Sequence, residues 1–177
     1  MFKEIIKICL NPFILIYFKI KLNHFIHINK NFNRFLVLDI DNTLANTWKY
    51  LKTKNKKKIS YSEIPLLVKT IEHIKKKYSN LPIVYISHRN ILNYYETDIW
   101  IQKNIINKNN FLILVSKPGD KLFYLNSILQ THRVIYYDDL SYNHENGKVL
   151  FYEKMIEEIK KMDIVYYDYD FIKKLNS

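Results

Sequence analysis

The stretch FLVLDIDNTLANT, residues 35–47, joins an apolar run to a group of acidic and polar residues. Its first four residues are apolar, and a short apolar run that ends at turn-forming residues is typical of a strand buried in a parallel sheet. Asp39 and Asp41 follow that run directly, and such carboxylates are costly to bury unless a cation or hydrogen bonds hold them. The carboxyl end of a strand is also where α/β proteins bind ligands. Taken alone, the stretch also suits an Asp-rich turn.

Four more short apolar runs follow along the chain, and segments with helical spacing separate them. The runs lie at 82–86, 111–115, 133–137 and 164–167, and the helices are expected at 62–78, 94–106, 119–130 and 148–162. This alternation predicts an α/β fold, a doubly wound (Rossmann-like) five-stranded parallel sheet with flanking helices and right-handed crossovers. Polar clusters follow the first four strands. We therefore expect them to meet at one edge of the sheet.

The bulk composition limits the class of protein. A chain of 177 residues with 48% hydrophobic residues is long enough for one well-buried domain. Cys9 is its single cysteine, which excludes a disulfide framework and a thiolate zinc cluster, and a cytoplasmic location is expected. The net charge of +11 is compatible with nucleic acid or an anionic membrane as partner. Lysine is spread along most of the chain, however, which predicts mainly solvated helix faces.

Residues 1–33 are predicted to form an amphipathic or apolar helical segment ahead of a domain at 34–177. A short helix is expected at 1–10. Asn11 is a typical cap and Pro12 a typical first-turn residue of a second helix. The apolar run Phe13–Phe18 is well short of the roughly 20 residues that a membrane-spanning helix needs. Two interpretations carry equal weight. One is a helical hairpin packed on the domain, and the other is a segment lying on an anionic membrane, peripheral at its inner face.

Four short motifs follow the first four predicted strands in order. They are DIDNT (39–43), ISHR (86–89), KPGDK (117–121) and YYDDL (136–140). This series resembles the four motifs of the haloacid dehalogenase-like phosphatase superfamily, over residues 34 to 170. The resemblance implies hydrolysis of a phosphomonoester with Mg²⁺ as cofactor, through an aspartyl-phosphate intermediate.

The resemblance also implies a role for each motif residue. Asp39 is the nucleophile, and Asp41 is the acid that protonates the leaving group and then activates water. Ser87 donates to a phosphoryl oxygen, and Arg89 grips the phosphate through its two-pronged guanidinium. Thr43 fixes the loop beside the substrate. The complete expected set is Asp39, Asp41, Ser87 and Lys121 as catalytic residues, Thr43, Arg89 and Lys117 as substrate-binding residues, and Asp39, Asp41, Asp138 and Asp139 as metal ligands.

Three positions stay open within this set. Lys117 and Lys121 compete for the third motif, and Lys121 is preferred because it begins a helix whose next residues are apolar. Asp138 is the first choice as direct Mg²⁺ ligand, with Asp39 and the backbone carbonyl of Asp41, and Asp139 is either a ligand or a neighbour of one. Asn42 stands where the family often has glycine, and asparagine tolerates left-handed backbone well. His144 is interpreted as an ordinary loop histidine.

The intervals between the motifs are too short for an inserted cap domain, so the chain resembles the small capless type. An open site favours a phosphate on a polymer, a macromolecule or a lipid, although small molecules are not excluded. The basic run Lys49–Lys58 lies beside the expected opening, and it is either a polyanion attractor or a solvated loop. The alternatives are a polynucleotide end-phosphatase and a non-catalytic module that docks on membrane or nucleic acid through residues 1–30 and the lysine run.

Overall fold

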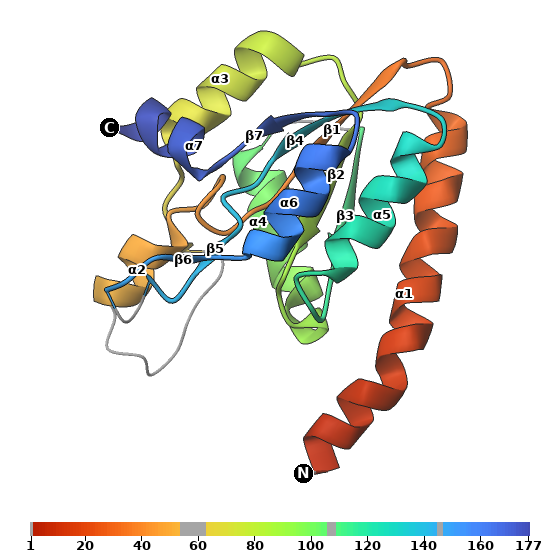
Figure 1. The fold of residues 1–177 in the computed structure, drawn as a ribbon, viewed down its shortest axis with the longest axis horizontal. Helices are drawn as coiled ribbons and strands as arrows, with labels where there is room; N and C mark the ends of the chain where they lie inside the picture. The colour runs from red at the N-terminus through yellow and green to blue at the C-terminus, as the bar shows by residue number, and fades with distance from the viewer. Residues whose placement is uncertain (1, 54–62, 106–108, 145–146) are drawn as a thin grey trace.

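The computed structural model describes residues 2–53, 63–105, 109–144 and 147–177, with side chains from residue 12 onward. Its centre is a five-stranded, all-parallel sheet in the order β3-β2-β1-β4-β7 (Figure 1). The strands are β1 (Arg34–Leu38), β2 (Ile83–Ser87), β3 (Asn110–Leu114), β4 (Arg133–Tyr137) and β7 (Ile164–Tyr167). The doubly wound α/β sheet predicted from the sequence is therefore confirmed, with each strand within one residue of its expected place.

Helices cover both faces of the sheet because each central strand is apolar on both sides. Phe35 and Val37 of β1 face one core, whereas Leu36 and Leu38 face the other, as the alternation of side chains along a strand requires. The first core is closed by α1 (Phe2–Ile28), α5 (Asp120–Leu129) and α6 (Glu153–Lys161). The second is closed by α3 (Val68–Tyr78), α4 (Tyr94–Asn104) and α7 (Tyr169–Asn176), with Tyr50 of α2 (Thr47–Thr53).

The strand order sets the position of the site. The chain runs outward from β1 to β2 and β3, then returns to place β4 on the other side of β1. β1 pairs in register with β4 from Arg34–Arg133 to Leu38–Tyr137, so the two strands end at the same level. Ligands of open α/β sheets bind at such a reversal, outside the carboxyl ends of the strands. Asp39 and Asp138 are the first residues beyond these two ends.

The segment between β1 and α3 differs from the prediction. The basic run Lys49–Lys58 was interpreted as a polyanion attractor or a solvated loop, but α2 occupies Thr47–Thr53. Residues 54–62, with the rest of that run and the expected start of the next helix, lie outside the described residues. Helix α3 begins only at Val68. The reason is a tertiary contact: Leu66 bridges to Ala45, and the Leu67 amide donates to the Leu44 carbonyl at 2.7 Å, so these residues are held in extended pairing.

The helix expected at 148–162 starts later, at Glu153, because the preceding residues pair with the loop after β4. β5 (Ser141–Tyr142) and β6 (Leu150–Phe151) form an antiparallel ribbon, and the Tyr142 and Tyr152 rings stack at 4.6 Å. The short helices η2 (Ile91–Asn93) and α7 were not predicted; the Asp168 side chain caps α7 by accepting from the Phe171 amide at 3.0 Å. Ile106, expected in the helix after β2, lies outside the described residues.

The amino-terminal segment is one continuous helix, so the expected hairpin is wrong. Pro12 lies inside α1; it removes one backbone hydrogen bond but does not end the helix. The carboxyl-terminal half of α1 packs on the sheet, with Phe18 and Leu22 buried in the first core, and the Tyr124 hydroxyl donates to the Leu15 carbonyl at 3.2 Å. No helix in the described part of the chain is long and apolar enough to cross a membrane.

Candidate active site

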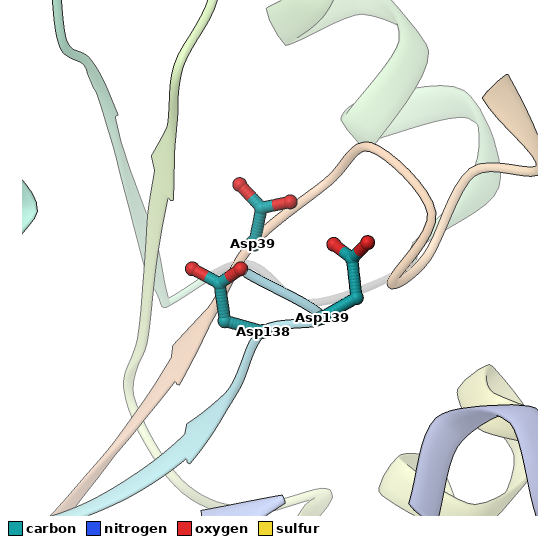
Figure 2. Close-up of side chains that lie close together, drawn as sticks. All are labelled: Asp39, Asp138 and Asp139. Atoms are coloured by element: carbon teal, nitrogen blue, oxygen red, sulfur yellow. The ribbon is translucent and has the colours of Figure 1, made fainter. Parts of the chain in front are cut away.

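Three aspartates gather beyond the ends of the central strands. Asp39 follows β1, and Asp138 and Asp139 follow β4. One ligand oxygen of each lies within 4.8 Å of the others, and Figure 2 shows the three carboxylates side by side. All three residues are at least 96% buried, with exposed fractions of 4%, 1% and 4%. The acidic residues of the first and fourth motifs, DIDNT and YYDDL, therefore lie close together in space.

Lys121 brings a positive charge into this cluster from the first turn of α5. Its Nζ lies 2.8 Å from Asp39 Oδ1 and 2.6 Å from Asp138 Oδ2, and the side chain is buried. Burial lowers the pKa of Lys121, but the charges of Asp138 and Asp39 outweigh that effect and raise it above its ordinary value. Lys117 is exposed, and its backbone amide donates to Asp120 at 3.2 Å. The structure thus places Lys121, and not Lys117, among the carboxylates.

The carboxyl groups differ in how strongly they hold protons. Burial raises the pKa of Asp39 well above 3.8; Lys121 lowers it, whereas the neighbouring aspartates raise it further. Burial likewise raises the pKa of Asp139, against the nearby His144 imidazole and a hydrogen bond from Ser141, which lower it. A positive charge placed among these oxygens would stabilise their ionised forms.

Asp41 lies apart from the cluster and has its own counter-ion. Arg89 Nε is 2.8 Å from Asp41 Oδ2 and Arg89 NH2 is 2.6 Å from Oδ1, which is a two-pronged pair. The Thr47 hydroxyl donates to Oδ1 at 2.5 Å, and Ser87 Oγ lies 3.5 Å from Oδ2. Burial raises the pKa of Asp41, but Arg89 and Thr47 together outweigh burial and lower it. Asp41 is therefore ionised at neutral pH.

Arg89 was expected to grip phosphate, and the structure directs its guanidinium to Asp41 instead. The residue is only 4% exposed, and its NH1 donates to the buried Thr97 hydroxyl at 3.2 Å. The guanidinium is thus held between the loop after β1 and helix α4. In this arrangement Arg89 orients Asp41.

Removing this pair is expected to cost stability. Arg89→Ala should lower the free energy of unfolding by about 2 kcal/mol at pH 7, because a charged hydrogen-bonded partner is lost from a mostly buried carboxylate. The pKa of Asp41 is lowered from 3.8, so its contribution is present above that pH and is lost as the pH falls through the folded-state pKa. Urea unfolding at pH 7 and at pH 3 measures both effects.

Arg89→Lys is the matched control. It keeps the positive charge but not the two-pronged guanidinium, so it should lose less free energy of unfolding than Arg89→Ala. An alanine variant as stable as the wild type at pH 7, or a difference that persists undiminished at pH 3, would contradict this account.

The loop after β1 is held in shape by two residues of its motif. Asn42 has φ 57°, a left-handed conformation that asparagine tolerates well, and its side-chain oxygen accepts from the Trp48 amide at 2.9 Å. Thr43 is fully buried, and its hydroxyl accepts from the Asp139 amide at 3.2 Å. Thr43 therefore ties the first motif to the fourth. It does not line the pocket of the site.

Hydrogen bonds hold both carboxylate oxygens of Asp138. Its Oδ1 accepts from the Leu140 amide at 2.9 Å, and its Oδ2 accepts from the Tyr136 hydroxyl as well as Lys121. The Tyr166 hydroxyl donates to its backbone carbonyl at 2.9 Å. Leu140 has φ 44°, which is unusual for a branched residue. This strained backbone conformation directs the Leu140 amide to Asp138.

Sequence patterns did not reveal several residues around Asp139. His144, interpreted as an ordinary loop residue, is 7% exposed; its Nε2 lies 2.6 Å from Ser141 Oγ and 3.8 Å from Asp139 Oδ2. Ser141 also hydrogen-bonds Asp139, and the Trp48 ring packs 5.4 Å from the His144 ring. Asp139, Ser141 and His144 lie within six consecutive residues, and α2 contributes Trp48 from a distant part of the chain. The pair Asn146-Gly147 in the sequence is a hairpin signal that could have indicated the β5–β6 ribbon beside them.

A small open pocket of about 100 Å³ lies over these groups. That is well below the roughly 300–1,000 Å³ of pockets that enclose a drug-sized ligand. The pocket has room for a phosphoryl-sized group while the remainder of a ligand stays outside. Its lining residues are Asp39, Asp41, Asn42, Ser87, His88, Pro118, Lys121, Asp138, Asp139, Leu140, Ser141 and Tyr152.

The charge balance of the pocket fits a divalent cation. Among the described residues, Arg89 pairs with Asp41, while Lys121 supplies one positive charge to Asp39, Asp138 and Asp139. Three carboxylates and one ammonium leave two negative charges when all are ionised. Mg²⁺ carries the complementary charge and prefers carboxylate oxygens. The donor set therefore suits this ion.

Comparisons of the chain with protein-family models, with curated proteins and with solved structures find no match.

Proposed function

We propose that the protein is a Mg²⁺-dependent phosphomonoester hydrolase that works through an aspartyl-phosphate intermediate. The observation that carries the proposal is the cluster of buried Asp39, Asp138 and Asp139 around Lys121, at the carboxyl edge of a parallel sheet. Such a cluster combines a nucleophile with groups that bind cations and offset phosphate charge. The order of the four sequence motifs, which resembles haloacid dehalogenase-like phosphatases, supports the same reaction.

In the proposed first step, a carboxylate oxygen of Asp39 attacks the phosphorus of the substrate. The bond between phosphorus and the ester oxygen breaks, and the leaving oxygen takes a proton from Asp41. Water then attacks the phosphoryl group on Asp39 and transfers a proton to Asp41, which releases inorganic phosphate and restores both carboxyl groups. Mg²⁺ bound to Asp39, Asp138 and the Asp41 carbonyl would supply charge neutralisation of the phosphoryl oxygens.

The contacts of Asp41 affect both of its proposed roles, as the acid for the leaving group and as the base for water. Its pKa is lowered, so it is a carboxylate at neutral pH, which is the form that accepts a proton from the attacking water. Arg89 donates to both of its oxygens, and the Thr47 hydroxyl donates to Oδ1. These contacts orient Asp41 for the second step, in which water attacks. For the first step, in which the leaving oxygen is protonated, Asp41 must carry a proton in the substrate complex.

Lys121 and Ser87 complete the proposed machinery. The Lys121 ammonium lies between Asp39 and Asp138, where it offsets charge that phosphate binding adds. Ser87 is buried at the end of β2 and lines the pocket, so its hydroxyl can donate to a phosphoryl oxygen. The small pocket volume supports a substrate whose non-phosphate portion stays outside, such as a polymer or a lipid, and small phosphomonoesters also remain candidates.

The test is phosphate release from a generic aryl phosphate, measured with Mg²⁺ and with a chelator. Turnover that depends on Mg²⁺ supports the proposal, and a purified, folded protein without turnover on this substrate or on a panel of phosphorylated metabolites and oligonucleotides would contradict it. Rates of turnover on the same panel show whether polynucleotide ends or other phosphorylated compounds are preferred.

Mg²⁺ is also expected to stabilise the fold. A ligand that binds only the native state at a hundred times its Kd adds about 2.7 kcal/mol to the free energy of unfolding. Thermal unfolding with MgCl₂ and with NaCl of equal ionic strength measures this gain. Asp139→Asn should reduce it, whereas Asp163→Asn at an exposed position away from the pocket should not. An equal gain in wild type and Asp139→Asn would show that Asp139 is not a ligand.

A further inference from the structure

The face of α1 that points away from the sheet is apolar. Phe13, Ile16, Tyr17 and Ile20 are 70%, 57%, 57% and 63% exposed. Their spacing of i, i+3, i+4 and i+7 aligns them along one side of a helix, and we call them the outer stripe. The opposite side of α1, which carries Leu22 at 0% exposure, is buried in the domain core. The helix is therefore apolar on two sides, of which the domain covers one.

Basic residues border the outer stripe. At 100° per residue, Lys19 falls on one side of the stripe and Lys21 on the other. The Lys19 ammonium lies 4.7 Å from the Phe123 ring, and the Lys21 ammonium lies 5.9 Å from the Tyr17 ring. The sequence from residue 5 to residue 38 contains no Asp or Glu, and its charged residues are Lys7, Lys19, Lys21, Lys30 and Arg34. The helix that carries the stripe is thus basic over this stretch.

We propose that the outer stripe docks on the surface of an anionic lipid bilayer. Helices that lie in a membrane interface combine an apolar face with lysines at its borders: the face enters the boundary of the acyl chains, and the lysine stems extend to the headgroups. The stripe has both features, and each basic residue near the surface strengthens attraction to anionic lipid. Docking through the side of the helix requires no membrane span.

The same observations disfavour two other partners. A second copy would bring two basic helices together, and the few side chains of the stripe are small beside the roughly 800 Å² per partner of a stable interface. Nucleic acid presents phosphates and base edges, and the aliphatic side chains of Ile16 and Ile20 offer these no complementary group. An anionic bilayer satisfies both the apolar centre and the basic borders.

The direction of α1 relates the docking surface to the candidate active site. Phe25 packs 6.0 Å from the Phe35 ring at the start of β1, whereas Phe18 stacks 6.0 Å from Tyr94, which follows the end of β2. The helix therefore runs antiparallel to the strands, with its amino-terminal half toward the edge that carries Asp39. Figure 1 shows this half of α1 extending beyond the rest of the domain. A bilayer docked there lies at the same end of the molecule as the site.

Co-sedimentation of the purified full chain with vesicles tests the proposal. The vesicles contain phosphatidylcholine alone or with about one-third phosphatidylserine, a composition that supplies the negative surface. The test variant changes Phe13, Ile16, Tyr17 and Ile20 to Gln. A matched control changes Leu92, Val68 and Val165 to Gln, which are exposed apolar residues on other elements (85%, 54% and 54% exposed). All changes are on the surface, and circular dichroism verifies folding.

We expect the wild type to bind anionic vesicles in a salt-sensitive manner and to bind phosphatidylcholine at least about tenfold more weakly. The stripe variant should lose at least about tenfold in affinity for the anionic vesicles, and the control should match the wild type. Lack of binding by the wild type, equal binding by the stripe variant, or a stripe that instead supports a concentration-dependent dimer would overturn the proposal. The assay requires no turnover, so its outcome is independent of the proposed phosphatase activity.

Discussion

Asp39→Asn is expected to lower the rate of phosphate release by at least about 10⁴-fold, since removal of a catalytic nucleophile typically costs at least that much. The amide of asparagine has nearly the shape of the carboxylate but cannot form the aspartyl-phosphate. Asp39 is 4% exposed, and its place at the end of β1 is fixed by the Asp39 amide, which donates to the Tyr137 carbonyl at 2.9 Å. Single-turnover measurements on an aryl phosphate with Mg²⁺ determine the loss.

The fold should tolerate this substitution. The pKa of Asp39 is raised above 3.8 mainly by burial, so the native state disfavours its ionised form, and stability from this group is lost as the pH rises above 3.8 through the folded-state pKa. At pH 7 asparagine removes the penalty, while Lys121 keeps Asp138 as a partner. We therefore expect the free energy of unfolding to change by no more than about 1 kcal/mol.

Asp163→Asn is the matched control, because it makes the same chemical change at an exposed position. It should leave turnover unchanged. A purified Asp39→Asn protein that retains more than about 1% of the wild-type rate would refute the aspartyl-phosphate mechanism, since a true nucleophile cannot be replaced at so small a cost.

Lys121→Met is expected to have the largest effect on stability. The ammonium is buried between Asp39 and Asp138 at 2.8 and 2.6 Å, and methionine fills a similar volume without charge. Removing one partner of a buried ion pair leaves uncompensated charge and typically costs about 3–5 kcal/mol. Urea unfolding at pH 7 measures the loss. Mg²⁺ should restore part of it, because the cation supplies positive charge to the same carboxylates.

Lys117→Met is a close control, four residues earlier in the same motif but exposed. It should change the free energy of unfolding by less than about 0.5 kcal/mol, as most surface substitutions do. The pair of variants also tests the third-motif assignment, since Lys121→Met should abolish turnover and Lys117→Met should not. Equal effects of the two substitutions on stability and on turnover would contradict the role given to Lys121.

The fold could be predicted from the sequence because its strands are short apolar runs with clear ends. β4 begins and ends at the predicted residues, and the other strands differ by one residue at most. Two of the features that were missed depend on pairing between separate segments. Leu66 is extended only because it pairs with Ala45, and the β5–β6 ribbon exists only because residues 141–142 meet residues 150–151.

The candidate site, like the fold, could be predicted from the sequence only in part. A strand places its following residues at a known edge of the sheet, so the sequence alone located Asp39, Ser87 and Asp138 near one another. It left two lysines, Lys117 and Lys121, as candidates for the same edge. It did not predict the partner of each side chain. Arg89 could reach a bound phosphate or Asp41, and burial beside Thr97 directs it to Asp41. His144 contacts Ser141 and lies 3.8 Å from Asp139, and these contacts were not predicted.

The sequence by itself determined the strands and the edge at which their polar ends collect, because these depend on residue types and local spacing. Only the tertiary structure decided that Lys121, and not Lys117, enters the site, that Arg89 pairs with Asp41, and that α1 is one helix. The physical reason is that pairing energies depend on distance and burial. Both are set by segments far apart in the chain, and no local pattern contains them.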